Sequence, residues 1–438
     1  MNESTLRIPV WMHRTLVPFI LLALCPPAVY VFWYINTVLG GSFEAFWHLV
    51  QAKGIFSTVF AISQPIFFGS AAAWKIIACF AAFQLLLMKL IPGKTFLGPI
   101  TPKGNVPVYK ANGVPCFLIT MGAFVLGSFG LHWFSATIIY DHLGAIFGAL
   151  NLFSLLFCLF LYFKGRVAPS SSDCGTTGYP MFDYYWGTEL YPRIFGWDVK
   201  MFTNCRFGMM GWPLILLSYA AKQSELYGLS DSMAVAVALQ LIYVAKFFVW
   251  ETGYLRSLDI MHDRAGFMIC WGCLVWVPCV YTSPTMYLVN HPIHLGAFWS
   301  AFIFLGGALS ILINYLADLQ RQQVRATNGA CLVWRRPPHL IQAPYRTQDG
   351  EAKQTLLLAS GWWGLSRHFH YVPEIAAAFF WSVPALFFNF IPYFYVCFLT
   401  VLLVNRAFRH DKRCADKYGE SWNLYCKKVP YKIIPYLF

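Results

Sequence analysis

The chain has 438 residues, of which 58% are hydrophobic, 18% aromatic and only 12% charged. Because soluble domains carry about twice that share of charge, the composition excludes an ordinary soluble protein. The formal net charge is +13, but the Lys and Arg residues lie in loops between apolar blocks, as expected on the cytoplasmic side of a membrane protein. We therefore predict a lipid bilayer as the environment and no nucleic-acid partner.

The apolar blocks predict membrane-spanning helices, because each is close to the roughly 20 residues that cross a hydrocarbon core. No small-residue cleavage motif follows the first block, so we expect a first span there and not a signal peptide. The predicted fold class is all-α, a polytopic transmembrane helical bundle of about ten helices. The predicted spans are Leu16–Tyr34, Ala71–Leu90, Pro115–Ser135, Leu143–Phe163, Met209–Ala221, Ala234–Trp250, Phe267–Leu288, Leu295–Leu316, Ala376–Phe388 and Pro392–Asn405.

The count of ten could change by about one or two helices, chiefly because of a further apolar stretch, Phe43–Phe68. His48, Lys53 and Gly54 interrupt this stretch, so it is not counted among the spans.

Three polar stretches separate the apolar blocks: Lys164–Cys205, Leu319–Thr355 and the tail after Asn405. The last two are basic and flank the final helical hairpin. If they share the cytosolic side, they could converge on a polyanionic ligand. A solvated positive-inside face explains the same charges, and charge alone favours that second interpretation.

Ionisable residues are dense just after the predicted span Ala234–Trp250, in the segments Tyr243–Glu251 and Leu255–Arg264. Such groups cost roughly 2.5–3.5 kcal/mol each at membrane depth, so they usually pair or serve a function. Simple ion pairs, Glu251 with Arg256 or Asp263 with Arg264, are one interpretation. Their density favours a polar pocket.

A second concentration of polar residues lies in Gly361–Glu374. Arg367, His370 and Glu374 follow helical spacing and would share one face. A zinc site at His368 and His370 is disfavoured, because helical metal ligands are typically four residues apart and a third ligand is not evident. We predict hydrogen-bond donors for a cofactor phosphate or amide and no metal; no Rossmann or Walker motif occurs.

Cysteines do not change this expectation. Many of the thirteen, such as Cys79, Cys158 and Cys270, lie inside apolar blocks. Buried free thiols that pack as small hydrophobic groups fit these positions better than disulfides or a zinc site.

Two long motifs resemble the signatures of the sterol reductase family, which includes Δ14-, Δ24(28)- and Δ7-reductases and lamin B receptor. The tail Arg406–Gly419, followed by Trp422, Tyr425 and Pro430-Tyr431, resembles the C-terminal signature R-x-x-R-D-x-x-x-C-x-x-K-Y-G. Asp183–Arg193 resembles the family motif G-x-x-x-x-P-R with its preceding aromatic-acidic run. Within the family, Trp250–Leu255, Asp259–Asp263 and Ser360–Ile375 resemble the Δ7-reductases, especially those of plant type.

This resemblance implies NADPH as the cofactor. The positions that match the family's cofactor contacts are Arg321, Arg325, Leu358, Trp363, His370, Tyr371, His410, Cys414, Tyr418 and Tyr425. One position departs from the family pattern: where the family has Asp directly after the second Arg, this chain has His410, and the acid follows as Asp411. A shift of one residue rotates a helical side chain by about 100°, so either His410 substitutes in a polar contact or Asp411 reaches in.

The implied reaction is reduction of the C7–C8 double bond of a 5,7-diene sterol in sterol biosynthesis, with a general acid that protonates carbon 8 and hydride delivered to carbon 7. Tyr243 is the expected acid by family position, since a phenol stays protonated at neutral pH. Asp411 or His410 is the alternative acid or a relay. A pocket open to the bilayer would suit the sterol.

The resemblance also sets the expected organisation and the competing functions. We expect one integral membrane domain over residues 1–438, with N-terminal helices in 1–230 and the sterol and NADPH pockets in 231–438. The membrane would be the endoplasmic reticulum in a eukaryote and the inner membrane in a bacterium. The alternatives are a Δ14- or Δ24(28)-reductase, a non-enzymatic sterol-binding protein, and an isoprenylcysteine methyltransferase, which the C-terminal hairpin resembles more distantly.

Overall fold

A computed structural model describes residues 9–101, 103–346 and 352–438. Residues 347–351, part of the predicted basic stretch Leu319–Thr355, lie outside the described residues. The described chain divides into two compact units. The first is built from Met1–Leu229 and Phe247–His291, and the second from Ser230–Lys246 and Pro292–Phe438.

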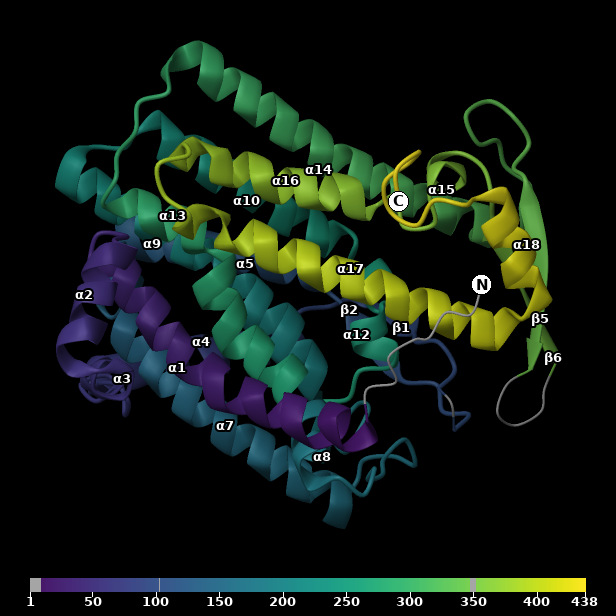
Figure 1. Ribbon diagram of the computed structural model, residues 1–438, viewed down its shortest axis with the longest axis horizontal. Coiled ribbons are helices and arrows are strands. Elements are labelled where there is room, and N and C mark those ends of the chain that lie inside the picture. Colours follow the sequence, from purple (N-terminus) through teal and green to yellow (C-terminus); the bar gives the residue numbers. More distant parts are fainter. Residues whose placement is uncertain (1–8, 102, 347–351) are drawn as a thin grey trace. The chain divides into compact units, whose positions relative to one another are not determined.

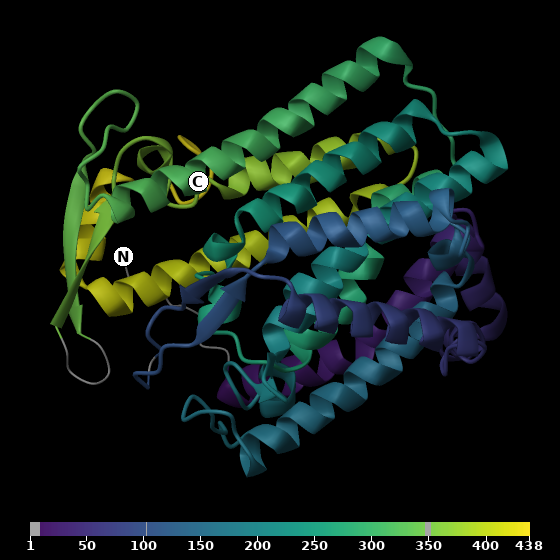
Figure 2. The same ribbon diagram turned by 180° about the vertical axis from the view of Figure 1, so that it is seen from behind.

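The first unit is a bundle of helices with two small antiparallel hairpins (Figures 1 and 2). Its longer helices are α1 (Val17–Thr37), α4 (Ala71–Leu90), α5 (Gly113–Val125), α7 (Leu143–Val167), α9 (Met209–Tyr227) and the π-helical segment η4 (Phe267–Tyr281). Its shorter helices are η1 (Met12–Leu16), α2 (Phe43–Lys53), α3 (Ile55–Ser63), η2 (Leu126–Gly130), α6 (Ile138–Asp141), α8 (Pro180–Trp186), η3 (Met201–Gly208), α11 (Glu251–Tyr254), α12 (Leu258–Met261) and α13 (Ser283–Val289). Strand β1 (Lys94–Leu97) pairs with β2 (Val108–Ala111), and β3 (Arg193–Ile194) pairs with β4 (Trp197–Asp198).

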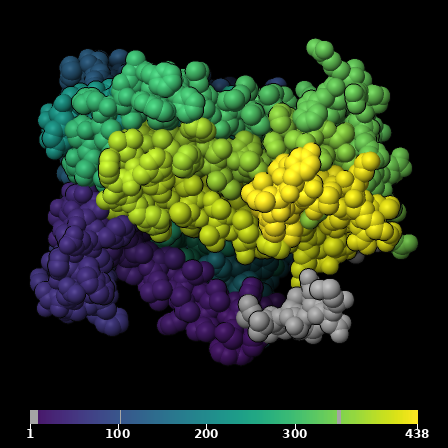
Figure 3. Space-filling model, turned by 45° about the horizontal axis from the view of Figure 1, so that its top comes forward, coloured from purple at the N-terminus to yellow at the C-terminus, as the bar shows by residue number. Residues whose placement is uncertain are grey.

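The second unit contains three long helices that run alongside one another, α14 (Gly296–Ala326), α16 (Tyr371–Ser382) and α17 (Ile391–Tyr418), together with most of α10 (Asp231–Val249) (Figure 1). The hairpin of β5 (Leu340–Arg346) and β6 (Ala352–Leu358) packs with α18 (Glu420–Lys428) at the end where α14 and α17 finish. Short helices α15 (Trp362–Leu365) and η5 (Val383–Ala385) precede and follow α16. In Figure 3 the C-terminal segment, in yellow, lies directly against the light-green surface of the preceding helices of this unit.

The predicted all-helical membrane architecture is confirmed. Among the described residues, seven helices are long and apolar enough to cross a membrane, or up to nine spans if each of two bent helix pairs counts as one. The predicted span Ala376–Phe388 is displaced, because α16 begins earlier, at Tyr371, and ends at Ser382, and Leu386 takes a positive φ of 55°. Helix α9, which holds the predicted span Met209–Ala221, is not among the seven.

The interrupted stretch Phe43–Phe68 folds as one of the two bent pairs. Helices α2 and α3 meet at Gly54 with a bend of 112°. Gly54 has a φ of +80°, a conformation that glycine adopts without the steric cost a side chain would bring. The break in hydrophobicity seen in the sequence is therefore a sharp turn between two short helices.

Buried polar contacts explain the ionisable residues near Leu255–Arg264. Glu251 pairs with Arg206 at 2.6 Å, and not with Arg256, whose guanidinium lies over the Phe96 ring. Arg264 donates to the Gly175 carbonyl at 2.6 Å. Burial lowers the pKa of Lys200 to about 8, and its ammonium donates to the carbonyls of Asp259, Ile260 and Asp263 at 2.7–2.9 Å. These contacts hold α12 and its flanking loop in place.

Candidate cofactor and proton-donor site

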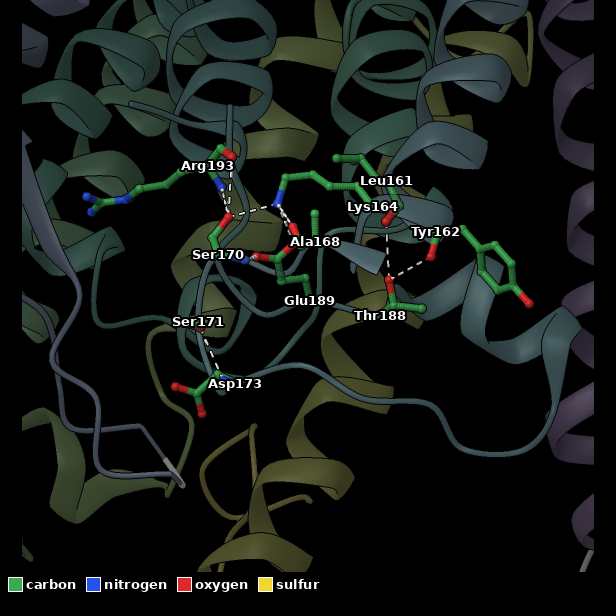
Figure 4. A network of polar contacts seen from close by, with 10 residues as sticks. All are labelled: Leu161, Tyr162, Lys164, Ala168, Ser170, Ser171, Asp173, Thr188, Glu189 and Arg193. Atoms are coloured by element: carbon green, nitrogen blue, oxygen red, sulfur yellow. Dashed lines mark hydrogen bonds and ion pairs between the residues drawn. The ribbon is translucent and has the colours of Figure 1, made fainter. Parts of the chain in front are cut away.

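The motif Gly187–Arg193, in the first unit, hydrogen bonds to the end of α7 and to the loop that follows it (Figure 4). The Glu189 carboxylate accepts from Lys164 at 2.8 Å and from the Ser170 backbone N–H. Thr188 donates to the carbonyls of Leu161 and Tyr162 near the end of α7 at 3.2 and 3.3 Å. Ser170 also accepts from the Arg193 backbone at 2.8 Å. This motif fastens the loop after α7 to the helix end.

In the second unit, a polar stripe follows one face of α14. Asn314, Asp318, Arg321 and Arg325 are spaced by four, three and four residues, so they project on the same side of the helix. Asn314 and Asp318 are only 3% and 6% exposed, whereas Arg325 on the last turn is exposed. The stripe therefore runs from the unit's interior to its surface.

Tyr243, which is half-buried, is linked through Lys246 to the Asn314 end of this stripe. Its hydroxyl donates to Glu374 Oε1 on α16, and its ring meets Trp381 edge-on at 5.2 Å. The Lys246 ammonium lies 5.2 Å from the Tyr243 ring centroid and donates to Asn314 Oδ1. The phenol is thus flanked by one carboxylate and one ammonium group.

Arg321 and His370 surround the indole of Trp363. The Arg321 guanidinium carbon lies 4.1 Å from the Trp363 centroid, and its Nη2 pairs with Asp318 at 3.1 Å. The His370 ring lies 4.9 Å from that of Trp363, and its backbone carbonyl accepts from Asn314 at 2.9 Å. Burial, aided by the charge of Arg321, lowers the pKa of His370 well below its ordinary value, so the imidazole is neutral at neutral pH.

The buried Nδ1 of His370 has no hydrogen-bond partner among the described residues. A buried polar atom without a partner is costly, and such atoms are a common sign that a ligand or water completes the site. This atom lies beside Trp363, Tyr371 and Arg321, all expected cofactor positions. A cofactor in this region could therefore hydrogen bond to His370 Nδ1 beside the Arg321 guanidinium, which is stacked on Trp363.

The shifted acid Asp411 is held by cationic and hydrogen-bonding partners. Its Oδ1 lies 3.1 Å from His368 Nε2, and its Oδ2 lies 3.2 Å from Arg367 Nη2 and 3.5 Å from Lys432 Nζ. His410 lies against the same His368, with 5.0 Å between the two ring centroids, and its Nδ1 lies 3.6 Å from Cys414 Sγ. The two neighbours on α17 thus share His368 but differ in their other contacts.

The remaining expected cofactor positions lie in two packed groups at the end of this unit. Leu358 and Trp363 pack with Val324 and Val333. Cys414 and Tyr425 share a second cluster, against which Tyr418 packs, and the Tyr425 hydroxyl donates to the Trp363 carbonyl at 3.1 Å. These contacts therefore bring together the expected cofactor positions on α15, α17 and α18.

His368, His410 and Asp411 also bring three potential metal ligands within 4.8 Å of one another. Arg367 and Lys432 already neutralise the Asp411 carboxylate. Adding a cation beside these two positive groups would be electrostatically unfavourable. The donor set suits a hydrogen-bonding or anionic ligand better than a metal ion.

Sequence reasoning did not include Glu374, Lys246 and Asn314 among the site residues. Lys246 and Glu374 stood in the polar segments it singled out, but their partners are far apart in sequence. The sequence signal that could have found them is the polar stripe on α14, whose residues recur every three or four positions on an otherwise apolar helix. Such a stripe indicates a buried polar site.

Comparison with known proteins gives the family. Residues 26–438 match the model of the ergosterol biosynthesis ERG4/ERG24 family. The chain belongs to this family. A relative named 7-dehydrocholesterol reductase, from Arabidopsis thaliana, is 53% identical over 440 residues, which cover 99% of this chain and 100% of the relative.

Further relatives carry the names of two different sterol reductases. A 7-dehydrocholesterol reductase from Danio rerio is 36% identical over 84% of this chain and 80% of the relative. A Delta(14)-sterol reductase from Methylotuvimicrobium alcaliphilum is also 36% identical, over 96% of this chain and 94% of the relative. The predicted membership of the sterol reductases is therefore confirmed, and the similarity extends along nearly the whole chain.

Proposed function

We propose that this protein is an NADPH-dependent sterol Δ7-reductase, which reduces the C7–C8 double bond of 5,7-diene sterols. The structural observation that carries the proposal is the half-buried Tyr243 phenol, placed between Glu374 and Lys246 in the second unit. The high identity to the Arabidopsis relative over its full length supports Δ7 specificity. The protein is a multi-pass membrane protein, which we place in the endoplasmic reticulum of a eukaryote or the inner membrane of a bacterium.

The residues around Trp363 fit NADPH. Arg321 and Arg325 would hold its phosphates, since guanidinium groups bind phosphate oxygens through paired hydrogen bonds. The neutral His370, with an unsatisfied Nδ1, would hydrogen bond to a polar group of the cofactor. The pocket would be completed by the other expected cofactor positions, which are Leu358, Trp363, Tyr371, His410, Cys414, Tyr418 and Tyr425. When bound, NADPH would supply the hydride.

Tyr243 acts as the general acid in the proposed reaction. Its phenolic proton passes to carbon 8, where the electron pair of the C7–C8 bond forms the new C–H bond. The positive charge left behind is shared over carbons 5 to 7, and hydride addition at carbon 7 leaves the C5–C6 double bond in place. Residues that hold the sterol in a dry pocket protect this charge from water.

Asp411 and His410 remain the competing acids. Asp411 accepts from Arg367 and His368, so its carboxylate is engaged as an acceptor, and His410 lies against Cys414. Tyr243→Phe keeps the ring but removes the proton, and turnover should fall by roughly 10²–10⁴-fold at saturating NADPH, with sterol binding retained. Near-normal turnover of Tyr243→Phe would move the role to Asp411 or His410.

The overall reaction is tested with purified protein in detergent or nanodiscs. 7-Dehydrocholesterol and NADPH are added, and loss of the conjugated-diene absorbance is followed together with the sterol product. We expect loss of absorbance that requires NADPH. A protein that binds the sterol without reducing it would contradict the proposal.

A Δ14-reductase is the second candidate, because the bacterial relative of that name aligns with 96% of this chain. An 8,14-diene sterol assayed in parallel separates the two. Faster reduction of the 8,14-diene would assign that specificity.

A further inference from the structure

The hydrogen bond between Tyr243 and Glu374 is arranged in a way that does not favour proton donation to a substrate. The phenolic O–H donates to Glu374 Oε1, so its proton points to the carboxylate. Loss of that proton would place a phenolate beside a carboxylate, and like charges in contact disfavour ionisation of both groups. Tyr243 can serve as an acid only if Glu374 first becomes neutral.

Glu374 is well placed to gain and pass on a proton. It lies in the first turn of α16, one turn after His370 and half-buried. Its partner Tyr243 lies 131 positions earlier in the chain and reaches it from α10. A neutral Glu374 carboxylic acid would donate its O–H to the Tyr243 oxygen, which turns the phenolic proton toward the space where a sterol would lie.

We propose that Glu374 is the proton-relay residue that reprotonates Tyr243 in every catalytic cycle, an inference that rests on the proposed Δ7-reductase function. A proton from solvent binds the Glu374 carboxylate. The Tyr243 O–H bond breaks as the C–H bond at carbon 8 forms, and the Glu374 O–H bond then breaks as its proton moves to the Tyr243 oxygen. The pair ends as a phenol donating to a carboxylate, which is the arrangement that the structure contains.

Lys246 supports the same cycle by its charge. Its ammonium lies 5.2 Å from the Tyr243 ring centroid and is held in place by Asn314. A positive charge at that position stabilises negative charge on the phenol oxygen while the two protons move. The relay thus combines a proton donor and a positive charge on α10 with a proton source on α16, and Asn314 on α14 holds the charge in place.

Rapid-mixing kinetics can separate the first proton transfer from the resupply. Enzyme is mixed with 7-dehydrocholesterol and excess NADPH, and diene absorbance is followed from the first turnover onward. In Glu374→Gln the amide N–H₂ still donates to the Tyr243 oxygen, but it has no acidic proton to give. We expect a burst of about one diene per active site at a rate within about threefold of wild type, then steady turnover slower by roughly 10²–10⁴-fold.

The comparison variants make the result decisive. Glu374→Asp keeps a carboxyl group and should recover part of the steady turnover, whereas Tyr243→Phe should give no burst and a turnover lower by roughly 10²–10⁴-fold. Glu420→Gln removes an exposed carboxylate on α18 and should behave as wild type. A merely structural role of Glu374 would reduce the burst together with the steady rate.

The outcomes also separate this inference from the proposed function. If wild-type protein consumes no diene, the Δ7-reductase assignment fails. If wild-type protein is active and Glu374→Gln turns over normally or loses its burst, the relay is overturned while the assignment stands.

Discussion

Arg321 and Arg325 lie one helical turn apart on α14 but have different surroundings. Arg321 is fixed by Trp363 and Asp318, through a stacking contact at 4.1 Å and an ion pair at 3.1 Å. Arg325 is exposed on the last turn, within electrostatic reach of Lys417 and Tyr418. Removing Arg321 would therefore disturb the pocket itself, which makes Arg325 the cleaner test of phosphate binding.

Arg325→Ala should raise the KM for NADPH by roughly 10–100-fold, as expected for loss of a hydrogen bond to a charged group. The KM for sterol should change much less. Steady-state assays with each substrate varied in turn measure both values. Arg335→Ala, which removes an exposed charge from the loop after α14, serves as the control. Equal use of NADH and NADPH by wild type would contradict the phosphate assignment.

The Arg206–Glu251 pair is the most buried ion pair described in the first unit. Its side chains are 0% and 4% exposed, and the 2.6 Å contact between Nη1 and Oε1 is close but not aligned as a hydrogen bond. Arg206 Nη2 donates to Asn112 Oδ1, and the Gly113 N–H donates to Glu251 Oε2, both at 2.8 Å. Each charge therefore depends on the other for compensation.

Glu251→Gln should destabilise the protein by about 3–5 kcal/mol, because it leaves the Arg206 charge buried without its partner. Arg206→Met should cost a similar amount. The double variant should be less destabilised than the sum of the two, since neither charge is then left alone. Denaturant unfolding in detergent measures the three values, and an additive double variant would show that the pair is not coupled.

At the scale of elements, α7 approaches its neighbours through glycines. A Cβ atom on Gly144 would lie 2.3 Å from the Trp33 ring of α1, and one on Gly148 would lie 1.6 Å from the Ile66 carbonyl oxygen. Small residues four apart let helices in a membrane approach closely. The spacing Gly144–Gly148 therefore positions α7 against α1 and the turn after α3.

Gly148→Ala should destabilise the first unit by at least about 1–3 kcal/mol, the usual cost of overpacking a close contact. The obstructing atom belongs to the backbone, so a side-chain rotation cannot relieve it. Gly122→Ala on α5 is the matched control, because nothing lies within 4 Å of its Cβ position. That control should be neutral or stabilising by up to about 1 kcal/mol. Equal unfolding midpoints for the two variants would refute the close approach.

At the scale of the whole molecule, the cofactor assignment carries a requirement for topology. NADPH is available in the cytosol, so the expected cofactor loops and the tail must face that side. The positive-inside rule predicts the same orientation for the basic stretches after α14 and after Asn405. Both arguments concern the second unit, where these stretches lie.

Arg335→Cys and Asn423→Cys should both react with a membrane-impermeant maleimide from the cytosolic side of sealed vesicles. Both positions are exposed. The parent protein, with its thirteen cysteines, gives the background. Labelling of either new cysteine only from the luminal or periplasmic side would overturn the topology.

The sequence by itself determined the class of fold and the family. Long apolar segments identify membrane helices because hydropathy is a local property that needs no knowledge of neighbours. The two signature motifs predicted the sterol reductase family, which the full-length similarity confirmed. The ends of helices were less predictable, as at Ser382, where a proline and a positive φ at Leu386 stop α16 before the apolar residues end.

Only the tertiary structure decided which polar residues are partners. Tyr243 meets Glu374, and Glu251 meets Arg206 although Arg256 is nearer in sequence. Such pairs depend on how each helix is rotated about its axis and packed on its neighbours, and one residue of offset turns a side chain by about 100°. For the same reason the partners of His410 and Asp411, which both lie against His368, were decided only once α17 was packed against the segment Arg367–His368.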